Sequence, residues 1–301
     1  MDKIICVVGP TASGKTALAV ELAKFTDGEV VSCDSMQLYR RMDIGTAKPT
    51  PEEMQGIPHH MIDILDPDED FSVGRYVDMA TPIVEDILAR GKTAIIAGGT
   101  GLYVDNLIKG GSFAPFPSTG CRERLDSLIR ELREIDPVAL QKSQNNPRRI
   151  IRALEVFQET GETITAHNER TAAIPPKFVP LWIGTDYVNR QDLYDRIDLR
   201  VELMVRDGLL NEIRSILNSG IPEKATAMQA IGYKEFIDAM AGRSTIEEAI
   251  AQVQQSSRRY AKRQQTWFKR NEKIHWLLRK KGQSAEEIFS AAFQLARNFD
   301  K

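Results

Sequence analysis

Residues 4–24 read IICVVGPTASGKTALAVELAK, and this stretch decides the fold. Residues 4–8 are apolar, as in a buried strand, and the residues after position 16 carry apolar side chains at helical spacing. Between these two parts, residues 9–16 match the pattern G-x-x-x-x-G-K-[ST], a phosphate-binding loop that follows a strand and opens a helix. The sequence therefore predicts an α/β protein of the P-loop type with a phosphate site near its N-terminus.

Each part of the loop suits a bound phosphate. Its glycines let the backbone fold around phosphate oxygens, while successive N–H groups and the start of the following helix supply partial positive charge. Lys15 adds a full positive charge, and the hydroxyl group of Thr16 can ligate Mg²⁺. The predicted diphosphate- or nucleotide-binding residues are those of the whole loop, Gly9, Pro10, Thr11, Ala12, Ser13, Gly14, Lys15 and Thr16.

Short apolar runs alternate with helix-like segments along the rest of the chain. Strands are predicted at residues 4–8, 30–33, 93–97, 179–183 and 274–278. Helices are predicted at residues 15–24, 74–89, 123–133, 146–158, 190–219, 245–270 and 284–298. This alternation indicates a parallel sheet with helices on both faces. Residues 111–176 hold helical patterns without a convincing strand, so we expect a helical insertion domain between residues 1–110 and 177–301 of the core domain.

Composition excludes several classes of protein. With 301 residues, 42% hydrophobic and 27% charged, the chain has the composition of a folded globular protein. Its apolar runs are too short to cross a bilayer, and its N-terminus has no signal-peptide pattern, so we expect a cytoplasmic protein that does not bind membranes. Cys6, Cys33 and Cys121 form no C-x-x-C pair, which disfavours a disulfide framework and a cysteine zinc site. Cys6 and Cys33 are expected to be buried as small hydrophobic side chains.

Charge is distributed unevenly, although the net charge is only −2. Residues 51–70 contain seven acids and no lysine or arginine, whereas residues 256–281 contain ten lysines and arginines opposed only by Glu272. The basic segment could contact a polyanion, or it could be an ordinary solvated helix face.

A carboxylate stands at an unusual place for a phosphate-loop protein. Enzymes that transfer a γ-phosphoryl group usually end a buried strand with an acid that helps hold the metal, but strand 93–97 runs into Gly98, Gly99, Thr100 and Gly101. Asp34 instead follows strand 30–33, at the sheet edge where the phosphate site is expected. Asp34 is therefore placed to touch a second substrate, or else it caps the turn that begins at Ser35.

Several blocks of the sequence together resemble bacterial tRNA dimethylallyltransferases, the tRNA isopentenyltransferases of the IPP transferase family. These blocks are GPTASGKT (9–16), VSCDSMQLYRRMDIGTAKPT (31–50), IPHHMIDI (57–64), AGGTGLY (97–103), PRRIIRALEV (147–156), AIGYKEF (230–236) and RRYAKRQQTW (258–267). The resemblance implies transfer of a dimethylallyl group from dimethylallyl diphosphate to N6 of the adenosine 3′-adjacent to the anticodon. The loop would then hold the diphosphate rather than ATP, with Mg²⁺ as cofactor and a tRNA anticodon stem-loop as partner of a monomeric enzyme.

The resemblance also assigns catalytic roles to three residues. Asp34 would accept a hydrogen bond from the N6 amine and take its proton as the new C–N bond forms, since a carboxylate is too weak a base to deprotonate it beforehand. Arg200 resembles a family arginine that reaches the diphosphate from outside the loop. Alternatively, Arg200 forms a surface ion pair with Asp198 or Glu202. Thr100 resembles a family position near the acceptor base, and alternatively caps the helix that follows.

An adenine must leave the stack of the anticodon loop to reach such a site. The resemblance places tRNA contacts at Asp34, Ser35, Met36, Gln37, Thr100, Arg122, Arg148, Arg149, Ile150, Ile151, Arg152, Gly232, Tyr233 and Lys234. Arg148 stands where many relatives carry an amide. The basic segment adds Arg259 and Arg263, while Tyr260 and Trp267 recur at helical spacing and are expected in the core. His59 and His60 are predicted to be structural, because adjacent histidines do not make a metal face.

Three other functions fit parts of the pattern. The chain could be an isopentenyltransferase that acts on free adenine nucleotides, although the helical insertion and the basic C-terminal segment favour tRNA. It could be a small-molecule kinase in which Asp34 grips the acceptor hydroxyl group. It could also be an RNA-binding module in which phosphate is only a structural ligand.

Overall fold

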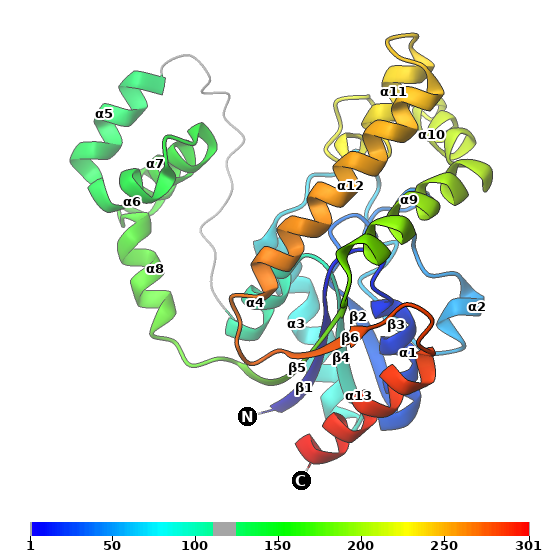
Figure 1. The fold of residues 1–301 in the computed structure, drawn as a ribbon. Helices are drawn as coiled ribbons and strands as arrows, with labels where there is room; N and C mark the ends of the chain where they lie inside the picture. The colour runs from blue at the N-terminus through cyan, green and yellow to red at the C-terminus, as the bar shows by residue number, and fades with distance from the viewer. Residues whose placement is uncertain (1, 111–124, 301) are drawn as a thin grey trace.

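The computed structural model describes residues 2–110 and 125–300, and a six-stranded parallel sheet forms its centre (Figure 1). The strands, in the order in which they lie across the sheet, are β3 (His59–His60), β2 (Gly28–Ser32), β4 (Thr93–Gly98), β1 (Asp2–Val8), β5 (Phe178–Tyr187) and β6 (His275–Arg279). The predicted parallel sheet is confirmed. The strand β3 was not predicted, because a two-residue strand is too short to show a periodic pattern. Since all strands are parallel, their carboxyl ends meet at one edge of the sheet.

Buried side chains alternate between the two faces of the sheet. In β1, Ile4, Cys6 and Val8 pack into one hydrophobic cluster, whereas Ile5 and Val7 pack into the other. Cys6 is fully buried, as is Cys33 after β2, so the prediction for these two cysteines is confirmed. Burial raises the pKa of both thiols, which keeps them protonated and chemically quiet.

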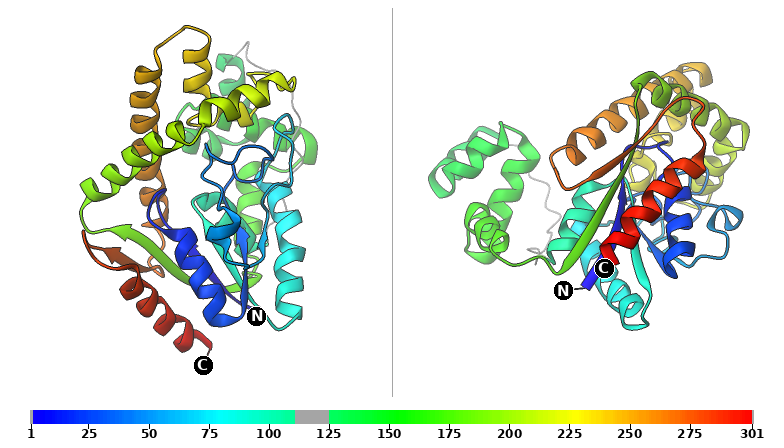
Figure 2. Two further views of the ribbon diagram at one scale, coloured as in Figure 1. Left: turned by 90° about the vertical axis from the view of Figure 1, so that its right-hand side faces the viewer. Right: turned by 60° about the horizontal axis from the view of Figure 1, so that its bottom comes forward.

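Helices cover both faces of the sheet (Figure 2). One face is covered by α1 (Lys15–Thr26) and α13 (Ala285–Asp300), whose Phe25 and Phe293 rings stack with centroids 4.4 Å apart. The other face is covered by α3 (Val73–Ala89) and α4 (Gly101–Lys109). A single helical turn, α2 (Pro51–Met54), lies in the segment that joins β2 to β3. The phosphate loop at the end of β1 thus opens directly into α1.

A second group of helices stands above the carboxyl edge of the sheet (Figure 1). It consists of α9 (Arg190–Arg206), α10 (Leu209–Asn218), α11 (Lys234–Met240) and α12 (Ile246–Phe268), with a short 3₁₀ turn, η1 (Ala227–Gln229). The prediction of one helix over 190–219 is wrong, because Gly208 adopts φ 107° and breaks the helix into α9 and α10. Tyr260 and Trp267 on α12 are also not core residues, since Tyr260 is only partly buried and Trp267 is 36% exposed.

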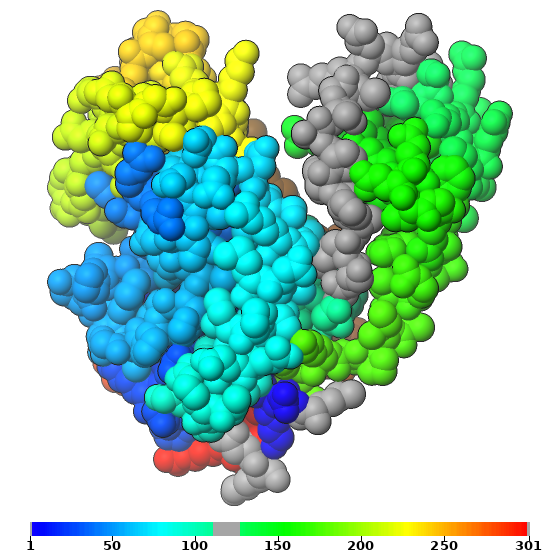
Figure 3. All heavy atoms as spheres, turned by 180° about the vertical axis from the view of Figure 1, so that it is seen from behind, coloured from blue at the N-terminus to red at the C-terminus, as the bar shows by residue number. Residues whose placement is uncertain are grey.

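The insertion between β4 and β5 has its own small hydrophobic core. Its helices are α5 (Leu125–Ile135), α6 (Pro137–Ser143), α7 (Pro147–Thr160) and α8 (Ile164–Ala172). Leu132, Ile150 and Leu154 pack together inside this group. The described residues of 111–176 contain helices and no strand, as predicted. In space-filling view these helices form a lobe beside the core (Figure 3).

Cys121 and Arg122 lie outside the described residues. Within residues 2–110 and 125–300, no helix has both the length and the apolar character needed to cross a membrane.

Candidate active site

A cavity of about 530 Å³ lies at the carboxyl edge of the sheet, next to the phosphate loop. Its wall brings together residues from the phosphate loop to α12 that are far apart in sequence. The polar and charged residues among them are Thr11, Lys15, Thr16, Ser32, Asp34, Gln37, Thr46, Lys48, Glu53, His59, Arg196, Arg200, Tyr260 and Gln264. The predicted loop residues Lys15 and Thr16, the acid Asp34 and the cation Arg200 therefore share one cavity.

The phosphate loop has the tight backbone that its sequence predicts. Gly9 and Gly14 have φ values of 143° and 92°, which side chains other than glycine rarely tolerate. A Cβ atom on Gly9 would lie 2.2 Å from the carbonyl oxygen of Thr185, so β5 leaves no room for one. The hydroxyl group of Ser13 donates to the carbonyl oxygen of Pro10 at 2.8 Å and lies 2.7 Å from the hydroxyl of Thr185. These contacts hold the loop against β5.

The side chain of Lys15 points back toward the first residues of the phosphate loop. Its Nζ donates a hydrogen bond to the carbonyl oxygen of Pro10 at 2.7 Å. Burial lowers the pKa of Lys15 to about 8, and the negative charge of Asp34 partly opposes this effect. The positive charge of Arg200 lowers the pKa further. Lys15, Asp34 and Arg200 are therefore close enough to influence one another electrostatically.

Arg200 reaches the phosphate loop from α9. Its Nη1 donates to the Thr11 hydroxyl at 3.2 Å, and burial lowers its pKa against the opposing charge of Asp34. The alternative of a surface ion pair is wrong. Asp198 pairs with Arg258, and Glu202 accepts a hydrogen bond from the Gln254 amide at 3.5 Å. A second arginine of α9, Arg196, donates to the carbonyl oxygen of Ala12 at 3.3 Å.

Asp34 both caps a turn and faces the cavity. Its Oδ1 accepts a hydrogen bond from the backbone N–H of Met36 at 2.9 Å, as the cap alternative predicted. Its side chain also lines the cavity, and no residue in the described part of the chain is hydrogen-bonded to Oδ2. One oxygen therefore orients the carboxylate while the other remains available to a substrate, so the two interpretations of Asp34 are compatible.

Thr100 forms hydrogen bonds with the residues on either side of Asp34. It occupies the N-cap position of α4, but its side chain makes no capping hydrogen bond, so the cap alternative is wrong. Its hydroxyl group instead accepts from the backbone N–H of Ser35 at 3.2 Å, and its own N–H donates to the carbonyl oxygen of Cys33 at 3.3 Å. Thr100 is not part of the cavity wall formed by the described residues.

Two residues of α12 complete the site and were not assigned a role from the sequence. Gln264 is buried and bridges two turns, because its Nε2 donates to the carbonyl oxygen of Gly99 at 3.0 Å and its Oε1 accepts from the N–H of Thr11 at 2.8 Å. Tyr260 lies one helical turn earlier and lines the cavity. Burial and the charge of Asp34 raise the pKa of Tyr260 to about 12, so its hydroxyl is protonated at neutral pH. Their spacing in RRYAKRQQTW was the signal that could have found them.

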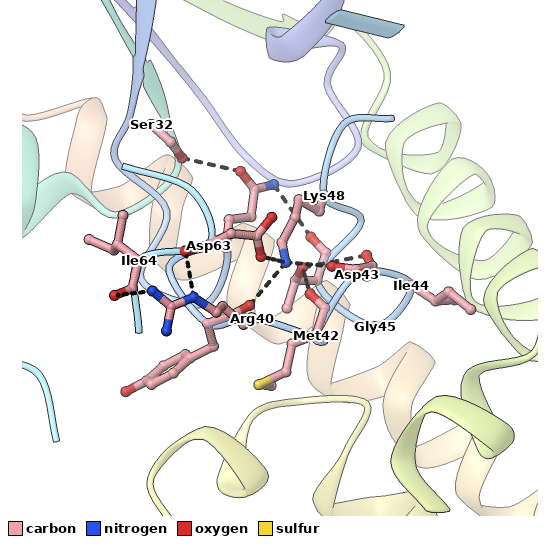
Figure 4. A network of polar contacts seen from close by, with 12 residues as sticks. Ser32, Arg40, Met42, Asp43, Ile44, Gly45, Lys48, Asp63 and Ile64 are labelled. Atoms are coloured by element: carbon pink, nitrogen blue, oxygen red, sulfur yellow. Dashed lines mark hydrogen bonds and ion pairs between the residues drawn. The ribbon is translucent and has the colours of Figure 1, made fainter. Parts of the chain in front are cut away.

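The segment between Asp34 and Lys48 is folded back on itself by polar contacts (Figure 4). Lys48 is 9% exposed, and its Nζ lies 2.5 Å from carboxylate oxygens of both Asp43 and Asp63 and 2.9 Å from the carbonyl oxygen of Tyr39. The Gln37 amide donates to the carbonyl oxygen of Ala47 at 3.2 Å. We call residues 34–48 the acceptor loop. Lys48 was not predicted, because nothing in the sequence indicates that a lysine in a loop is buried.

The structure places the remaining predicted tRNA contacts in different environments. Those with side chains exposed to solvent are Arg148, Arg149, Lys234, Arg259 and Arg263, and those partly buried are Ser35, Met36, Gln37, Ile151 and Arg152. Arg263 lies over the Tyr260 ring, 5.4 Å from its centroid. Ile150 and Tyr233 are fully buried and Gly232 is buried too, so in this conformation the side chains of Ile150 and Tyr233 have no surface to offer to RNA.

Donors for a metal ion are few at this site. No group of three or more His, Cys, Asp or Glu side chains in residues 2–110 and 125–300 could hold a metal by itself. The predicted ligand Thr16 lines the cavity, and its hydroxyl has no hydrogen-bond partner among the described protein atoms. His60 Nε2 lies 2.8 Å from Glu29 Oε2, and His59 Nδ1 lies 2.8 Å from the carbonyl oxygen of Ile57. Since His59 also lines the cavity, a purely structural role for this pair stays a prediction.

Family models and curated relatives match most of the chain. Residues 37–271 match the family model described as IPP transferase, and residues 2–69 match the model described as isopentenyl transferase. The chain is 45% identical to a tRNA dimethylallyltransferase of Caldanaerobacter subterraneus subsp. tengcongensis, over 97% of this chain and 96% of that protein.

Solved structures give the same result. The chain is similar to a tRNA isopentenylpyrophosphate transferase of Bacillus halodurans, with a TM-score of 0.77 and 40% identity over 100% of this chain and 97% of the other. It is also similar to a eukaryotic dimethylallyltransferase described as acting on tRNA, with a TM-score of 0.82 and 28% identity over 99% of this chain and 80% of the other. The fold thus agrees with the resemblance in the sequence.

Proposed function

Because the chain belongs to the IPP transferase family, we propose that it is a tRNA dimethylallyltransferase. It transfers the dimethylallyl group of dimethylallyl diphosphate to N6 of the adenosine 3′-adjacent to the anticodon and releases diphosphate. The observation that carries this proposal is the position of Asp34 in one cavity with Lys15 and Arg200. A free carboxylate oxygen there faces an acceptor while two cations face the leaving group.

The reaction needs electrostatic help more than strong acid or base catalysis. As the N6 lone pair forms the C–N bond, the allylic C–O bond breaks and diphosphate departs with its electron pair. Lys15, Arg200 and the loop N–H groups stabilise the negative charge that gathers on the leaving oxygen. Asp34 orients the amine through Oδ2 and accepts the proton that N6 loses. Two apolar side chains, Leu203 and Val30, line the same cavity and suit the prenyl chain.

We propose that Mg²⁺ binds at this site together with the diphosphate. Mg²⁺ keeps several waters and commonly binds one or two protein oxygens together with substrate phosphates. The lone, unpartnered Thr16 hydroxyl next to Lys15 fits that donor set, whereas an all-protein cage is not present among the described residues. When bound, the ion would help neutralise the diphosphate.

The tRNA anticodon stem-loop is the proposed partner of a monomeric enzyme. We propose residues 111–176 as a tRNA-contacting insertion domain on a core formed by residues 1–110 and 177–301. Exposed Arg148 and Arg149 on α7, and exposed Arg259 and Arg263 on α12, would contact the phosphate backbone. Tyr260, on the same helix, lines the cavity that contains Asp34, so the basic residues of α12 lie close to the site proposed for the adenosine.

Radiolabelled dimethylallyl diphosphate, mixed with unmodified tRNA, tests the proposed function. We expect label to enter the RNA with Mg²⁺ present and ATP absent, and nuclease digestion should recover it on N6 of one adenosine. Label on AMP or ADP but not on tRNA would instead support a nucleotide isopentenyltransferase. Phosphate transfer from ATP would support a kinase, and RNA binding without any transfer would support a binding module.

Replacement of Arg263 by alanine should weaken tRNA binding and reduce its salt dependence. The side chain is exposed and has no ion pair within the described part of the protein, so a phosphate is the partner we expect. The slope of log K against log salt should fall by roughly 0.7 to 0.9 per lost phosphate contact. Filter binding over a series of salt concentrations measures it. Arg297→Ala on α13 is the matched control, because Arg297 is also exposed and also lies over an aromatic ring, that of Phe25. An unchanged slope for Arg263→Ala would mean that the Arg263 side chain is only solvated.

A further inference from the structure

The carboxylate of Glu212 on α10 receives an unusual number of hydrogen bonds from the acceptor loop. Three consecutive backbone N–H groups donate to it, those of Asp43 at 2.9 Å, Ile44 at 2.7 Å and Gly45 at 3.1 Å. The hydroxyl group of Tyr233 donates to the same carboxylate at 2.7 Å. Glu212 therefore occupies an anion-binding turn that, in other proteins, holds a phosphate or a free carboxylate.

Tyr233 and Gly45 fit together at this contact. Tyr233 is fully buried, and a Cβ atom on Gly45 would lie 2.5 Å from its ring. Burial, and then the charge of Glu212, raise the pKa of Tyr233, so its hydroxyl stays protonated and donates. The blocks 31–50 and 230–236 thus meet at one place, although neither Glu212 nor Tyr233 lines the cavity wall formed by the described residues.

Polar contacts lead from this turn back to Ser32, which precedes Asp34 in the chain (Figure 4). The turn is followed directly by Thr46 and Ala47, which line the cavity and whose carbonyl oxygens accept from the Gln37 amide at 3.5 and 3.2 Å. The hydroxyl of Ser32 donates to Oε1 of Gln37 at 3.1 Å. The same hydroxyl accepts from the N–H of Asp34 at 3.4 Å.

We propose that Glu212, held by Tyr233, is a positioning residue for prenyl transfer: it fastens the acceptor loop so that Asp34 and Gln37 meet the target adenosine in the reactive geometry. This inference rests on the proposed function. The diphosphate is gripped by other elements, the phosphate loop and Arg200 of α9. Glu212 should therefore matter for the acceptor and not for the donor, and Tyr233 serves the same end instead of touching tRNA.

The test compares Glu212→Gln and Tyr233→Phe with the unaltered protein. Glutamine keeps the size of the side chain but removes its charge and turns an N–H group toward the turn, whereas phenylalanine keeps the ring against Gly45 and removes only the hydroxyl. Glu223→Gln is the matched control, because Glu223 is exposed, pairs with Arg243 at 3.6 Å and makes no contact with the acceptor loop. Three measurements are needed: transfer kinetics with tRNA and donor varied separately, affinity for inorganic diphosphate by calorimetry, and amide hydrogen exchange at residues 43–45.

We expect Glu212→Gln to lower kcat/KM for tRNA by on the order of 10- to 100-fold, as for a reactive group displaced by about 1 Å. Tyr233→Phe should lower it less, by about 3- to 10-fold, since one hydrogen bond to the carboxylate is lost. Affinity for inorganic diphosphate should stay within about threefold in both variants, because no donor contact is removed. Amides 43–45 should exchange faster in Glu212→Gln, and Glu223→Gln should match the unaltered protein.

Other outcomes overturn the inference. A tRNA kcat/KM that stays near the unaltered value, despite faster exchange at residues 43–45, means that the loop is fastened but does not position the acceptor. An equal loss of diphosphate affinity means that Glu212 supports the fold in general. If the unaltered protein transfers no prenyl group to tRNA, the proposed function fails separately. Exchange at residues 43–45 still tests the contact in that case, and unchanged exchange in Glu212→Gln overturns it.

Discussion

Replacement of Asp34 by alanine is expected to lower turnover by on the order of 10² to 10⁴, the usual contribution of a positioned general base. Affinity for tRNA should change by only a few-fold, because the RNA is held mainly through its phosphates. The reason lies in the two oxygens of Asp34. Oδ1 is held by the Met36 N–H at 2.9 Å, and Oδ2 is left to orient the amine and receive its proton. Single-turnover kinetics and filter binding with the same tRNA measure the two quantities.

Asp34→Asn separates the role of the charge from the role of the turn. Asparagine can still accept the Met36 N–H through its amide oxygen, so the turn should persist while the proton acceptor is lost. We therefore expect Asp34→Asn to be nearly as slow as Asp34→Ala. Asp68→Asn removes an exposed acid elsewhere on the surface and should leave turnover unchanged. Near-normal turnover in Asp34→Asn would contradict the proton-accepting role and leave Asp34 with the turn alone.

The elements that could be predicted from the sequence are those whose physical cause is local. The glycines and Lys15 of the phosphate loop are dictated by a single contiguous pattern, and the strands on either side follow from short apolar runs. Asp34 was placed correctly at the carboxyl edge, because in a parallel sheet every strand ends on the same side. The resemblance to a family then supplied the direction in which Arg200 points.

What could not be predicted depends on contacts between distant segments. The break between α9 and α10 requires a positive φ at Gly208, which a helical pattern on both sides conceals. The spacing of Gln264 and Tyr260 could place both on one face of α12, but it could not show that Gln264 bonds to Gly99, which lies more than half the chain away. Tyr233 looked like a tRNA contact because it lies in a block typical of the family, yet its hydroxyl is used by Glu212 inside the protein. A motif therefore indicates that a residue matters, and only the packing shows how.

Replacement of Lys15 by alanine is expected to lower kcat/KM for dimethylallyl diphosphate by on the order of 10² to 10³, the range seen when one preorganised donor to a developing charge is removed. Lys15 lies at the end of the phosphate loop, with its Nζ 2.7 Å from the Pro10 carbonyl, in the cavity that also holds Arg200. In the proposed complex Arg200 also contacts the diphosphate, so the loss should be partial. Affinity for tRNA alone should be unaffected, and an equal loss for both substrates would indicate a misfolded loop.

The pH dependence gives a sharper test of Lys15. Burial lowers the pKa of Lys15 to about 8, so the ammonium form that attracts diphosphate is present below this pH and is lost above it. Since kcat/KM reports the free enzyme, its value for the donor should fall about tenfold per pH unit above that pKa. The value of kcat should fall at higher pH, because bound diphosphate favours the charged lysine. In Lys15→Arg, the guanidinium stays charged throughout, and the alkaline fall should disappear.

Asp34 and Lys15 should be coupled in the same profile, which links the two halves of the site. The negative charge of Asp34 raises the pKa of Lys15 against the larger effect of burial. Asp34→Asn removes that charge, so the alkaline fall in the remaining activity should move to lower pH, whereas Asp68→Asn should leave it in place. Initial rates at donor concentrations well below KM, from pH 6 to 10, measure the position of the fall. If the fall occurs at the same pH in Asp34→Asn and in the unaltered protein, a group other than Lys15 titrates. The charge of Asp34 should shift the pKa of Lys15, so removal of that charge cannot leave a Lys15 titration in place.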